Sequence, residues 1–319
     1  MRVFVTGAAG FIGFHSAMKL LGQGHHVHGF DNLNAYYDPR FKEARLLELQ
    51  RNPKFSFTRG NLADVAKLKE AWDAAKPDVV LHLGAQAGVR YSIENPQAYV
   101  ESNLVGFQNV IELARHARVS NFVYASSSSV YGGNKTLPFS EDQQVSNPIS
   151  FYAATKLANE LVAKSYFNLY GLKSTGLRFF TVYGPFGRPD MAMFKFAELM
   201  KAGKPIEVYN EGAMWRDFTY VDDIVSGIMA ALAKPESAEV YNLGRGEKMR
   251  LMEMIELLEK YLDTPAKKVM MPMQMGDVEA TLADVSKARR QLGYAPQTHL
   301  ADGMREFCSW FMKITSAKL

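Results

Sequence analysis

The sequence predicts an α/β fold, in which a doubly wound parallel sheet is followed by a smaller C-terminal α/β domain. Short β-rich runs alternate with longer helical patterns up to about residue 180. These runs are apolar and β-branched, which is typical of parallel strands buried on both faces. A glycine-rich segment at residues 6–13 joins the first strand to the first helix. The length of 319 residues suggests two domains, at about 150 residues per domain.

The first part of the chain contains six expected strands, at residues 2–5, 26–30, 55–59, 79–83, 121–125 and 174–179. Four helices are expected between them, at residues 11–23, 64–75, 96–118 and 152–170. This alternation implies βαβ units with right-handed crossovers. We expect a Rossmann-type domain at residues 1–180, to which a later segment at about 217–245 returns.

The pattern changes after Phe180, where Gly–Pro and similar pairs break the chain into short pieces. A helix is expected at residues 221–233, a strand at 239–242 and another helix at 251–262. Residues 181–319 should therefore form mainly a smaller α/β domain, which binds the substrate and is interleaved with the end of the first domain.

Composition excludes several classes of function. The net charge is +4 and the basic residues are scattered, so we expect no nucleic-acid partner. No apolar run approaches the roughly 18–20 residues of a membrane span, and a glycine turn follows the first apolar run where a signal peptide would need a cleavage site. We expect a cytosolic protein. The single cysteine, Cys308, allows no intramolecular disulfide, and no cluster has metal-ligand spacing.

Three glycines predict a dinucleotide site. Gly7 permits a tight turn, Gly10 lets the backbone approach a pyrophosphate, and Gly13 allows close packing of helix on sheet. The helix that follows presents free N–H groups and the positive end of its dipole to the phosphates. Asp31 ends the second strand, where a carboxylate accepts hydrogen bonds from ribose hydroxyls and repels a 2′-phosphate. The expected cofactor is therefore NAD rather than NADP.

A Tyr-x-x-x-Lys motif at Tyr152 and Lys156 predicts acid–base chemistry. Positions i and i+4 share one face of a helix, so the ammonium can favour the phenolate of a tyrosine whose ordinary pKa is about 10. Four serines at positions 126–129 lie at the end of the fifth strand. In open α/β sheets, this edge lines the crevice where ligands bind.

These motifs resemble the extended short-chain dehydrogenase/reductase superfamily. The resemblance implies that Ser127 is catalytic together with Tyr152 and Lys156. Asn61 stands where the family usually has Asp beside the adenine, and Asn can still hydrogen-bond the base. The cofactor-binding residues implied, apart from Tyr152 and Lys156, are Gly7, Gly10, Phe11, Ile12, Gly13, Asp31, Asn32, Asn61, Leu62, Leu83, Gly84 and Ala85.

Several longer stretches resemble the nucleotide-sugar epimerases, and within them most closely the UDP-glucuronate 4-epimerases. They lie at residues 31–38, 86–92, 179–192, 216–223 and 276–278. The resemblance implies that C4 of a UDP-sugar is inverted through a transient 4-keto intermediate, and that the reaction converts UDP-glucuronate to UDP-galacturonate. Residues 128 and 129, next to Ser127, are serines where dehydratases of the family carry Asp or Glu. The implied substrate-binding residues are Ser128, Ser129, Thr181, Arg188, Arg216, Gln274 and Asp277.

The same resemblance implies a homodimer that pairs through the two long helices expected at residues 96–118 and 152–170. Two alternatives to the UDP-glucuronate epimerase remain. One is another nucleotide-sugar enzyme, such as a UDP-glucose/galactose 4-epimerase, a decarboxylase or a dehydratase. The other is a scaffold that binds NAD without turnover, although such proteins typically lose the tyrosine or the lysine that this chain retains.

Overall fold

A seven-stranded parallel sheet forms the centre of the molecule in a computed structural model, which describes residues 1–235, 237–274 and 276–316. The strands lie in the order β3-β2-β1-β4-β5-β6-β11, and every neighbouring pair is parallel. They are β1 (Arg2–Thr6), β2 (His26–Asp31), β3 (Phe55–Arg59), β4 (Val79–His82), β5 (Phe122–Ser127), β6 (Ser174–Phe179) and β11 (Glu239–Leu243). The predicted doubly wound sheet is confirmed. The strand order reverses between β1 and β4, which is where such sheets bind ligands.

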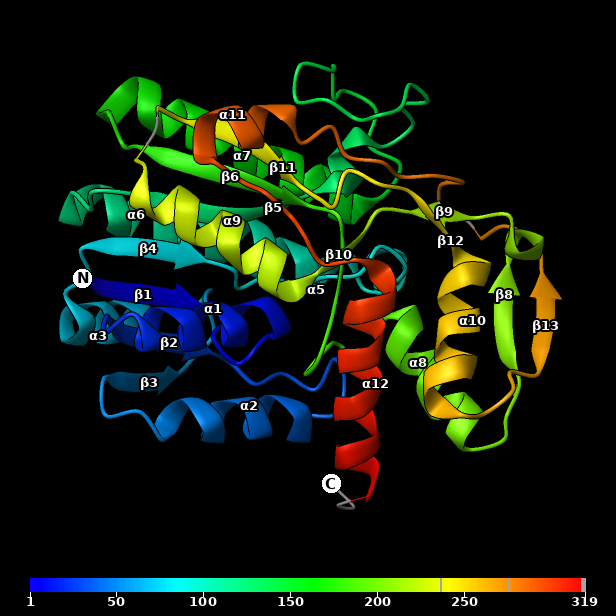
Figure 1. The fold of residues 1–319 in the computed structure, drawn as a ribbon. Coiled ribbons are helices and arrows are strands. Elements are labelled where there is room, and N and C mark those ends of the chain that lie inside the picture. Colours follow the sequence, from blue (N-terminus) through cyan, green and yellow to red (C-terminus); the bar gives the residue numbers. More distant parts are fainter. Residues whose placement is uncertain (236, 275, 317–319) are drawn as a thin grey trace.

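Helices cover both faces of this sheet (Figure 1). On one face lie α1 (Phe11–Gly22), α2 (Arg40–Gln50) and α9 (Val221–Ala233), and on the other lie α3 (Val65–Ala75), α6 (Gly106–Ala117) and α7 (Phe151–Tyr170). Side chains alternate between the two faces along β1. Val3 and Val5 pack in the core beneath α1 and α9, whereas Phe4 packs in the core beneath α3, α6 and α7. Because both faces are covered, the strand is apolar at successive positions.

The expected helix at residues 96–118 is divided in the structure. It consists of α5 (Pro96–Tyr99), a π-helical segment η1 (Val100–Val105) and α6. The wide turn carries the buried Asn103, whose side chain bonds the main-chain N–H and carbonyl of Gln86 at 2.8 and 3.0 Å. Asn159 of α7 donates to the carbonyl of Asn103 at 2.7 Å. The π-helical turn thus joins α7 to the loop after β4, in line with the frequent occurrence of such turns at functional sites.

The second part of the chain gathers beyond the carboxyl ends of the sheet strands (Figure 1). Its strands form three pairs: β7 (Thr181–Tyr183) with β10 (Phe218–Tyr220), β8 (Ile206–Tyr209) with β13 (Lys268–Met271), and β9 (Trp215–Arg216) with β12 (Met249–Arg250). Its helices are α8 (Ala192–Lys201), α10 (Leu251–Leu262) and α12 (Leu300–Ser316), whereas α11 (Ser286–Leu292) packs on the sheet against β11 and α9. Short helical turns are α4 (Tyr91–Glu94) and η2 (Ser128–Tyr131) in the first part of the chain and η3 (Asn210–Gly212), which follows β8, in the second part. The helices α2, α8, α11 and α12 are not among those that the sequence predicts.

The carboxylate of Asp217 ties the segments after β6 together. It is fully buried and accepts hydrogen bonds from the main-chain N–H groups of Arg245, Gly246 and Ala283, at 2.6, 3.0 and 3.1 Å. The hydroxyl of Thr219 also donates to it, at 3.0 Å. One side chain beside β10 therefore holds both the loop that follows β11 and the strand-like segment near Ala283.

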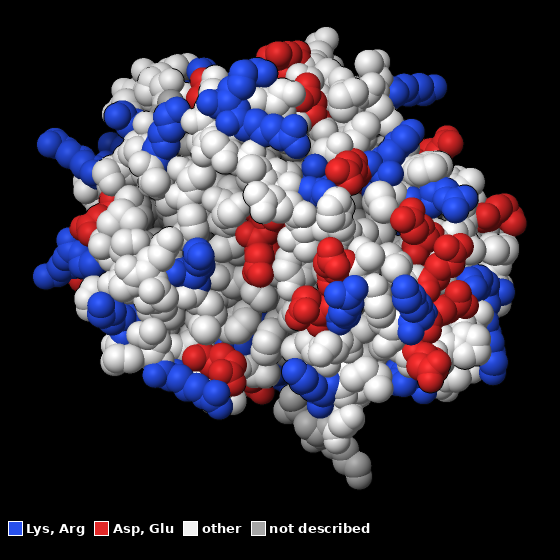
Figure 2. Space-filling view, in the orientation of Figure 1, with Lys and Arg blue, Asp and Glu red and all other residues white. Residues whose placement is uncertain are grey.

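Surface and membrane-related features add little to this picture. Among the described residues, the structure contains no helix that is both long and apolar enough to span a membrane. On the face drawn in Figure 2, Lys and Arg side chains are interspersed with Asp and Glu side chains. The cytosolic location and the domain boundaries stay predictions.

Candidate active site

A cavity of about 630 Å³ opens at the carboxyl ends of β1, β2, β4, β5 and β6. Every residue that the sequence predicts for catalysis, cofactor binding or substrate binding lines it, with the exception of Gln274. The carboxyl ends of neighbouring parallel strands meet at one edge of a sheet, and this explains the convergence of residues so distant in the chain. Gln274 lies outside the lining, and its Oε1 atom is buried without a hydrogen-bond partner among the described residues.

The glycine-rich loop is packed so closely that side chains are excluded at Gly7 and Gly13. Gly7 has a φ of +68°, and a Cβ atom on it would lie 2.7 Å from the main-chain nitrogen of Gly84. A Cβ atom on Gly13 would lie only 2.0 Å from the carbonyl oxygen of Gly7. Gly10 begins α1 without a side-chain cap. The first N–H groups of the helix are therefore available to an anion in the cavity.

Asp31 holds the loop from the end of β2. Its carboxylate accepts hydrogen bonds from the N–H of Ala9 at 3.2 Å and from the N–H of Leu33 at 2.9 Å. Burial raises the pKa of Asp31, whereas the Leu33 N–H and the charge of Lys42 lower it. Asp31 also lines the cavity, where it fits the predicted contact with a ribose.

Ser127, Tyr152 and Lys156 meet where β5 ends and α7 begins. Ser150 caps α7 by accepting from the N–H of Ala153 at 3.1 Å, which sets the first turns of the helix. The Lys156 ammonium donates to the carbonyl of Ala125 at 2.9 Å, and burial lowers the pKa of Lys156 to about 8. Burial raises the pKa of Tyr152, while a hydrogen bond with Ser127 and the charge of Arg188 lower it. Arg188 thus adds a cation that favours the phenolate, an effect that the sequence motif attributes to Lys156.

A buried ion pair lies next to the group formed by Ser127, Tyr152 and Lys156. Arg178 of β6 and Glu160 of α7 pair at 2.7 Å, with side chains only 3% and 8% exposed. The hydroxyl of Ser126 donates to the same carboxylate at 2.5 Å. The pair therefore fixes α7 against the ends of β5 and β6, one residue from Ser127. Neither Glu160 nor Arg178 stands out in the sequence, because their roles depend on partners far away in the chain.

Arg216 and Asp277 form a second polar centre in the cavity. They pair at 2.7 Å, and Arg90 approaches the other oxygen of Asp277 at 3.7 Å. Burial lowers the pKa of Arg216, and the charge of Asp277 opposes that effect. The guanidinium of Arg90 also lies 5.0 Å above the ring centre of Tyr209. Arg90 and Tyr209 were not predicted as site residues, although Arg90 lies in a stretch that resembles the epimerases.

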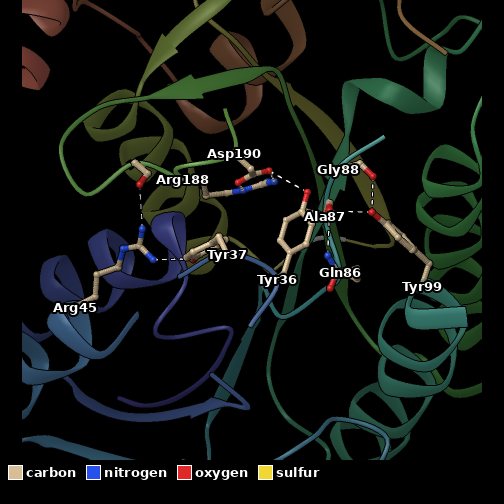
Figure 3. Close-up of polar contacts among 10 residues, drawn as sticks. Tyr36, Tyr37, Arg45, Gln86, Ala87, Gly88, Tyr99, Arg188 and Asp190 are labelled. Atoms are coloured by element: carbon tan, nitrogen blue, oxygen red, sulfur yellow. Dashed lines mark hydrogen bonds and ion pairs between the residues drawn. The ribbon is translucent and has the colours of Figure 1, made fainter. Parts of the chain in front are cut away.

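Hydroxyl groups and one arginine surround the space near Ser127. Ser128, Ser129 and Thr181 all line the cavity, and the N–H of Ser129 donates to the Ser127 hydroxyl at 3.1 Å. Arg188 pairs with Asp190 at 2.5 Å, and the hydroxyl of Tyr36 donates to Asp190 at 3.1 Å (Figure 3). Asp190 and Tyr36 also lie in stretches that resemble the epimerases, but they were not predicted as site residues, because the sequence does not show that they meet. No group of three or more potential metal ligands occurs among the described residues.

Comparison with known proteins agrees with these features. Residues 3–244 match the model of the NAD dependent epimerase/dehydratase family. An uncharacterised protein of Methanocaldococcus jannaschii is 51% identical over 98% of this chain and 96% of its own length. A probable UDP-glucuronate 4-epimerase of Rhizobium meliloti is 44% identical over 98% of this chain and 97% of its own length.

The fold is also similar to that of a solved enzyme. The crystal structure of the UDP-glucuronic acid 4-epimerase of Bacillus cereus, in complex with UDP-glucuronic acid and NAD, superposes with a TM-score of 0.92. The two chains are 36% identical, and the match covers 98% of this chain and 100% of the other.

Replacing Gly13 with alanine should damage the glycine-rich loop. A methyl group 2.0 Å from the Gly7 carbonyl forces the loop away from α1, and overpacking of this kind costs about 1–3 kcal/mol. We expect Gly13→Ala to lower the thermal unfolding midpoint and the NAD content of the purified protein. Gly22→Ala is the matched control, because a Cβ at Gly22 in the same helix meets nothing within 4 Å. If Gly13→Ala and Gly22→Ala had the same unfolding midpoint and the same NAD content, the close packing at Gly13 would be contradicted.

Proposed function

The chain belongs to the NAD dependent epimerase/dehydratase family, and we propose that it interconverts UDP-glucuronate and UDP-galacturonate by inverting C4. The observation that carries the proposal is the content of one cavity. The glycine-rich loop, the group of Ser127, Tyr152 and Lys156, and the pair of Arg216 and Asp277 all line it. Relatives of similar length support the choice of substrate, because they include a probable UDP-glucuronate 4-epimerase at 44% identity.

The loop geometry fits NAD. Side chains are excluded at Gly7 and Gly13, and Gly10 leaves the first N–H groups of α1 free for a pyrophosphate. Asp31 lines the cavity one strand away, at the position that suits ribose hydroxyls. When bound, NAD supplies a reversible acceptor for the C4 hydrogen and its electron pair, so that the overall reaction involves no net oxidation.

Tyr152 is the base in this proposal. Its phenol takes the proton of the C4 hydroxyl as the 4-keto sugar forms, and returns the proton when the opposite face is reduced. The hydrogen bond with Ser127 and the charge of Arg188 both lower the pKa of Tyr152, which favours the deprotonated base against the effect of burial. In this proposal Ser127 bonds the reacting oxygen, and Lys156, one helical turn after Tyr152 in α7, stabilises the phenolate.

Arg216 and Asp277 suit the UDP part of the substrate. A guanidinium pairs with diphosphate oxygens in a fork, and a carboxylate accepts hydrogen bonds from a ribose. Arg90, which also approaches Asp277, adds a second cation to this end of the cavity. Gln274 stays a prediction for the same subsite.

The glucuronate carboxylate has its own requirement. The 4-keto intermediate is a β-keto acid, which loses CO₂ when the carboxylate bond aligns with the carbonyl π system. An epimerase must therefore hold the carboxylate in another orientation and keep its charge localised. The hydroxyl groups of Ser128, Ser129 and Thr181 can do this by donating hydrogen bonds, without supplying a competing acid.

The proposal is tested by incubating the purified protein, without added NAD, with a panel of UDP-sugars and separating the products. We expect UDP-glucuronate to give UDP-galacturonate without accumulation of NADH. Tyr152→Phe should retain NAD and lose turnover, since acid–base catalysis contributes about 10²–10⁴-fold. Preference for UDP-glucose would favour the glucose/galactose epimerase, pentose products would favour a decarboxylase, and NAD binding with no turnover of any sugar would favour the scaffold.

Thr181→Val tests the carboxylate site, because it keeps the shape of the side chain and deletes the donor. A hydrogen bond to an ionised group is worth about 1.5–3 kcal/mol, which corresponds to a loss of about 10- to 100-fold in kcat/KM for UDP-glucuronate. The fraction of pentose by-product should rise. Thr175→Val in β6 is the control, because its buried hydroxyl has no hydrogen-bond partner among the described residues. An unchanged rate and product purity in Thr181→Val would remove Thr181 from the site.

We further propose that two chains pair through α6 and α7. Helix α7 exposes Leu161 and Leu169, whose exposed fractions are 65% and 67%. Exposed apolar side chains on a long helix can be covered by the same helix of a second copy at a two-fold interface. Light scattering should give the mass of two chains for the wild type and a lower mass for Leu161→Lys. Leu47→Lys, at a side chain on α2 that is 63% exposed, is the control. A monomeric wild type at micromolar concentration would contradict the dimer.

A further inference from the structure

Arg45 of α2 is a fully buried arginine whose hydrogen bonds all go to uncharged oxygen atoms. Its Nε and one terminal nitrogen donate to the carbonyl of Phe186 at 3.1 and 2.7 Å, and the same terminal nitrogen donates to Gly187 at 3.1 Å. The other terminal nitrogen donates to the carbonyl of Ala9 at 3.0 Å and to the hydroxyl of Tyr37 at 2.8 Å. These bonds engage every side of the guanidinium. Because burying a cation is costly, its fixed position calls for an explanation.

The acceptors of Arg45 belong to the two halves of the site. Ala9 lies inside the glycine-rich loop, between Gly7 and Gly10, whereas Phe186 and Gly187 immediately precede Arg188. Figure 3 shows the Arg45 side chain directed at Tyr37 and at the loop that carries Arg188. One side chain therefore connects the proposed cofactor loop with the segment that brings Arg188 into the cavity.

The segment before Arg188 needs to be held in place. Phe186 has a φ of +56°, in the left-handed region that a bulky side chain disfavours. His15 of α1 bonds the carbonyl of Pro185 at 2.8 Å. The Phe186 ring packs against Phe14 and Trp310, with ring centres 4.8 and 5.2 Å away. Arg45 completes this support by holding the next two carbonyl groups.

The head group of Arg188 is fixed by a second set of contacts. Its Nε donates to Asp190 at 3.1 Å, and Asp190 also accepts from the Tyr36 hydroxyl (Figure 3). Tyr36 and Tyr37 are neighbours in the connection between β2 and α2, so one holds the partner of Arg188 and the other contacts Arg45. The backbone and the head group of Arg188 are thus both set by residues 36–45 of the cofactor side.

We propose that Arg45 is a positioning residue, which sets the place of Arg188 in the sugar site by fastening the segment at residues 185–187 to the glycine-rich loop. The inference rests on the proposed function, because it assigns Arg45 to the site where the UDP-sugar reacts. It implies that the cofactor loop and the sugar pocket adjust as one unit. A shift of the glycine-rich loop moves Ala9, and through Arg45 it moves the backbone that carries Arg188.

The test is a double-mutant cycle in the NAD-containing enzyme. Arg45→Met, Arg188→Met and the double variant are compared with the wild type by NAD content, by kcat expressed per bound NAD, and by KM for UDP-glucuronate. We expect Arg45→Met alone to lower kcat/KM about 10- to 100-fold, as a displaced catalytic group does. In the Arg188→Met background the same change should cost little more, because both act through one side chain. If the losses in kcat/KM of the two single variants multiply in the double variant, the proposal is overturned.

Two further variants keep the cycle interpretable. Arg45→Lys retains the charge but has only three donors, so its activity should lie between those of Arg45→Met and the wild type. If Arg45→Met does not fold, Arg45→Lys takes its place in the cycle. Arg40→Met is the control on the same helix, since the Arg40 side chain is 72% exposed and lies outside the cavity. It should behave as the wild type.

Failure of the proposed function would be visible separately, because the wild type itself would not epimerise UDP-glucuronate. In that case NAD retention still tests Arg45. We expect Arg45→Met to purify with less NAD than the wild type and Arg40→Met to purify with the same amount. Full NAD content in Arg45→Met would show that Arg45 does not support the glycine-rich loop, and it would overturn the coupling.

Discussion

The close approach of α1 to the end of β1 is the constraint on which the rest of the site depends. The carbonyl of Gly7 lies where a side chain at Gly13 would have to be, and the backbone at Gly84 closes the turn from the other side. This contact brings the beginning of α1 to the edge of the sheet. It also directs the carbonyl of Ala9 towards Arg45 and its N–H towards Asp31. The cofactor site and the support of the sugar site thus start from one turn.

Much of the fold and most of the candidate site could be predicted, because local chemistry determines them. β3, β6, α9 and α10 have the bounds that their apolar patterns predict. The parallel topology then brings the ends of β1, β2, β4 and β5 to one edge, so that residues as distant as Gly7, Asp31 and Tyr152 line one cavity. No long-range information beyond the strand order is needed for that result.

The features that were missed depend on contacts between distant residues. Helix α2 has no clear apolar face, because its buried residues are Lys42 and Arg45 as well as Leu46 and Leu49. Its polar buried side serves the site rather than a hydrophobic core, and a search for apolar periodicity overlooks it. In the same way, the expected helix at residues 96–118 carries a π-helical turn, which follows from the contacts of Asn103 and not from propensity. At such positions, contacts with distant residues determine the local structure.

The return of β11 to the sheet has a consequence for the biosynthesis of the chain. The six residues of β6 are all buried, and their outer neighbour β11 is separated from them by the whole segment from Thr181 to Ala238. While the ribosome is still making that segment, β6 pairs with β5 on one side only, and its unpaired outer edge can template aggregation. The edge strand β11 can be added to the sheet only after residue 243 has emerged from the ribosome. We therefore expect a nascent chain that stops near Phe180 to depend on chaperones rather than to fold as an independent unit.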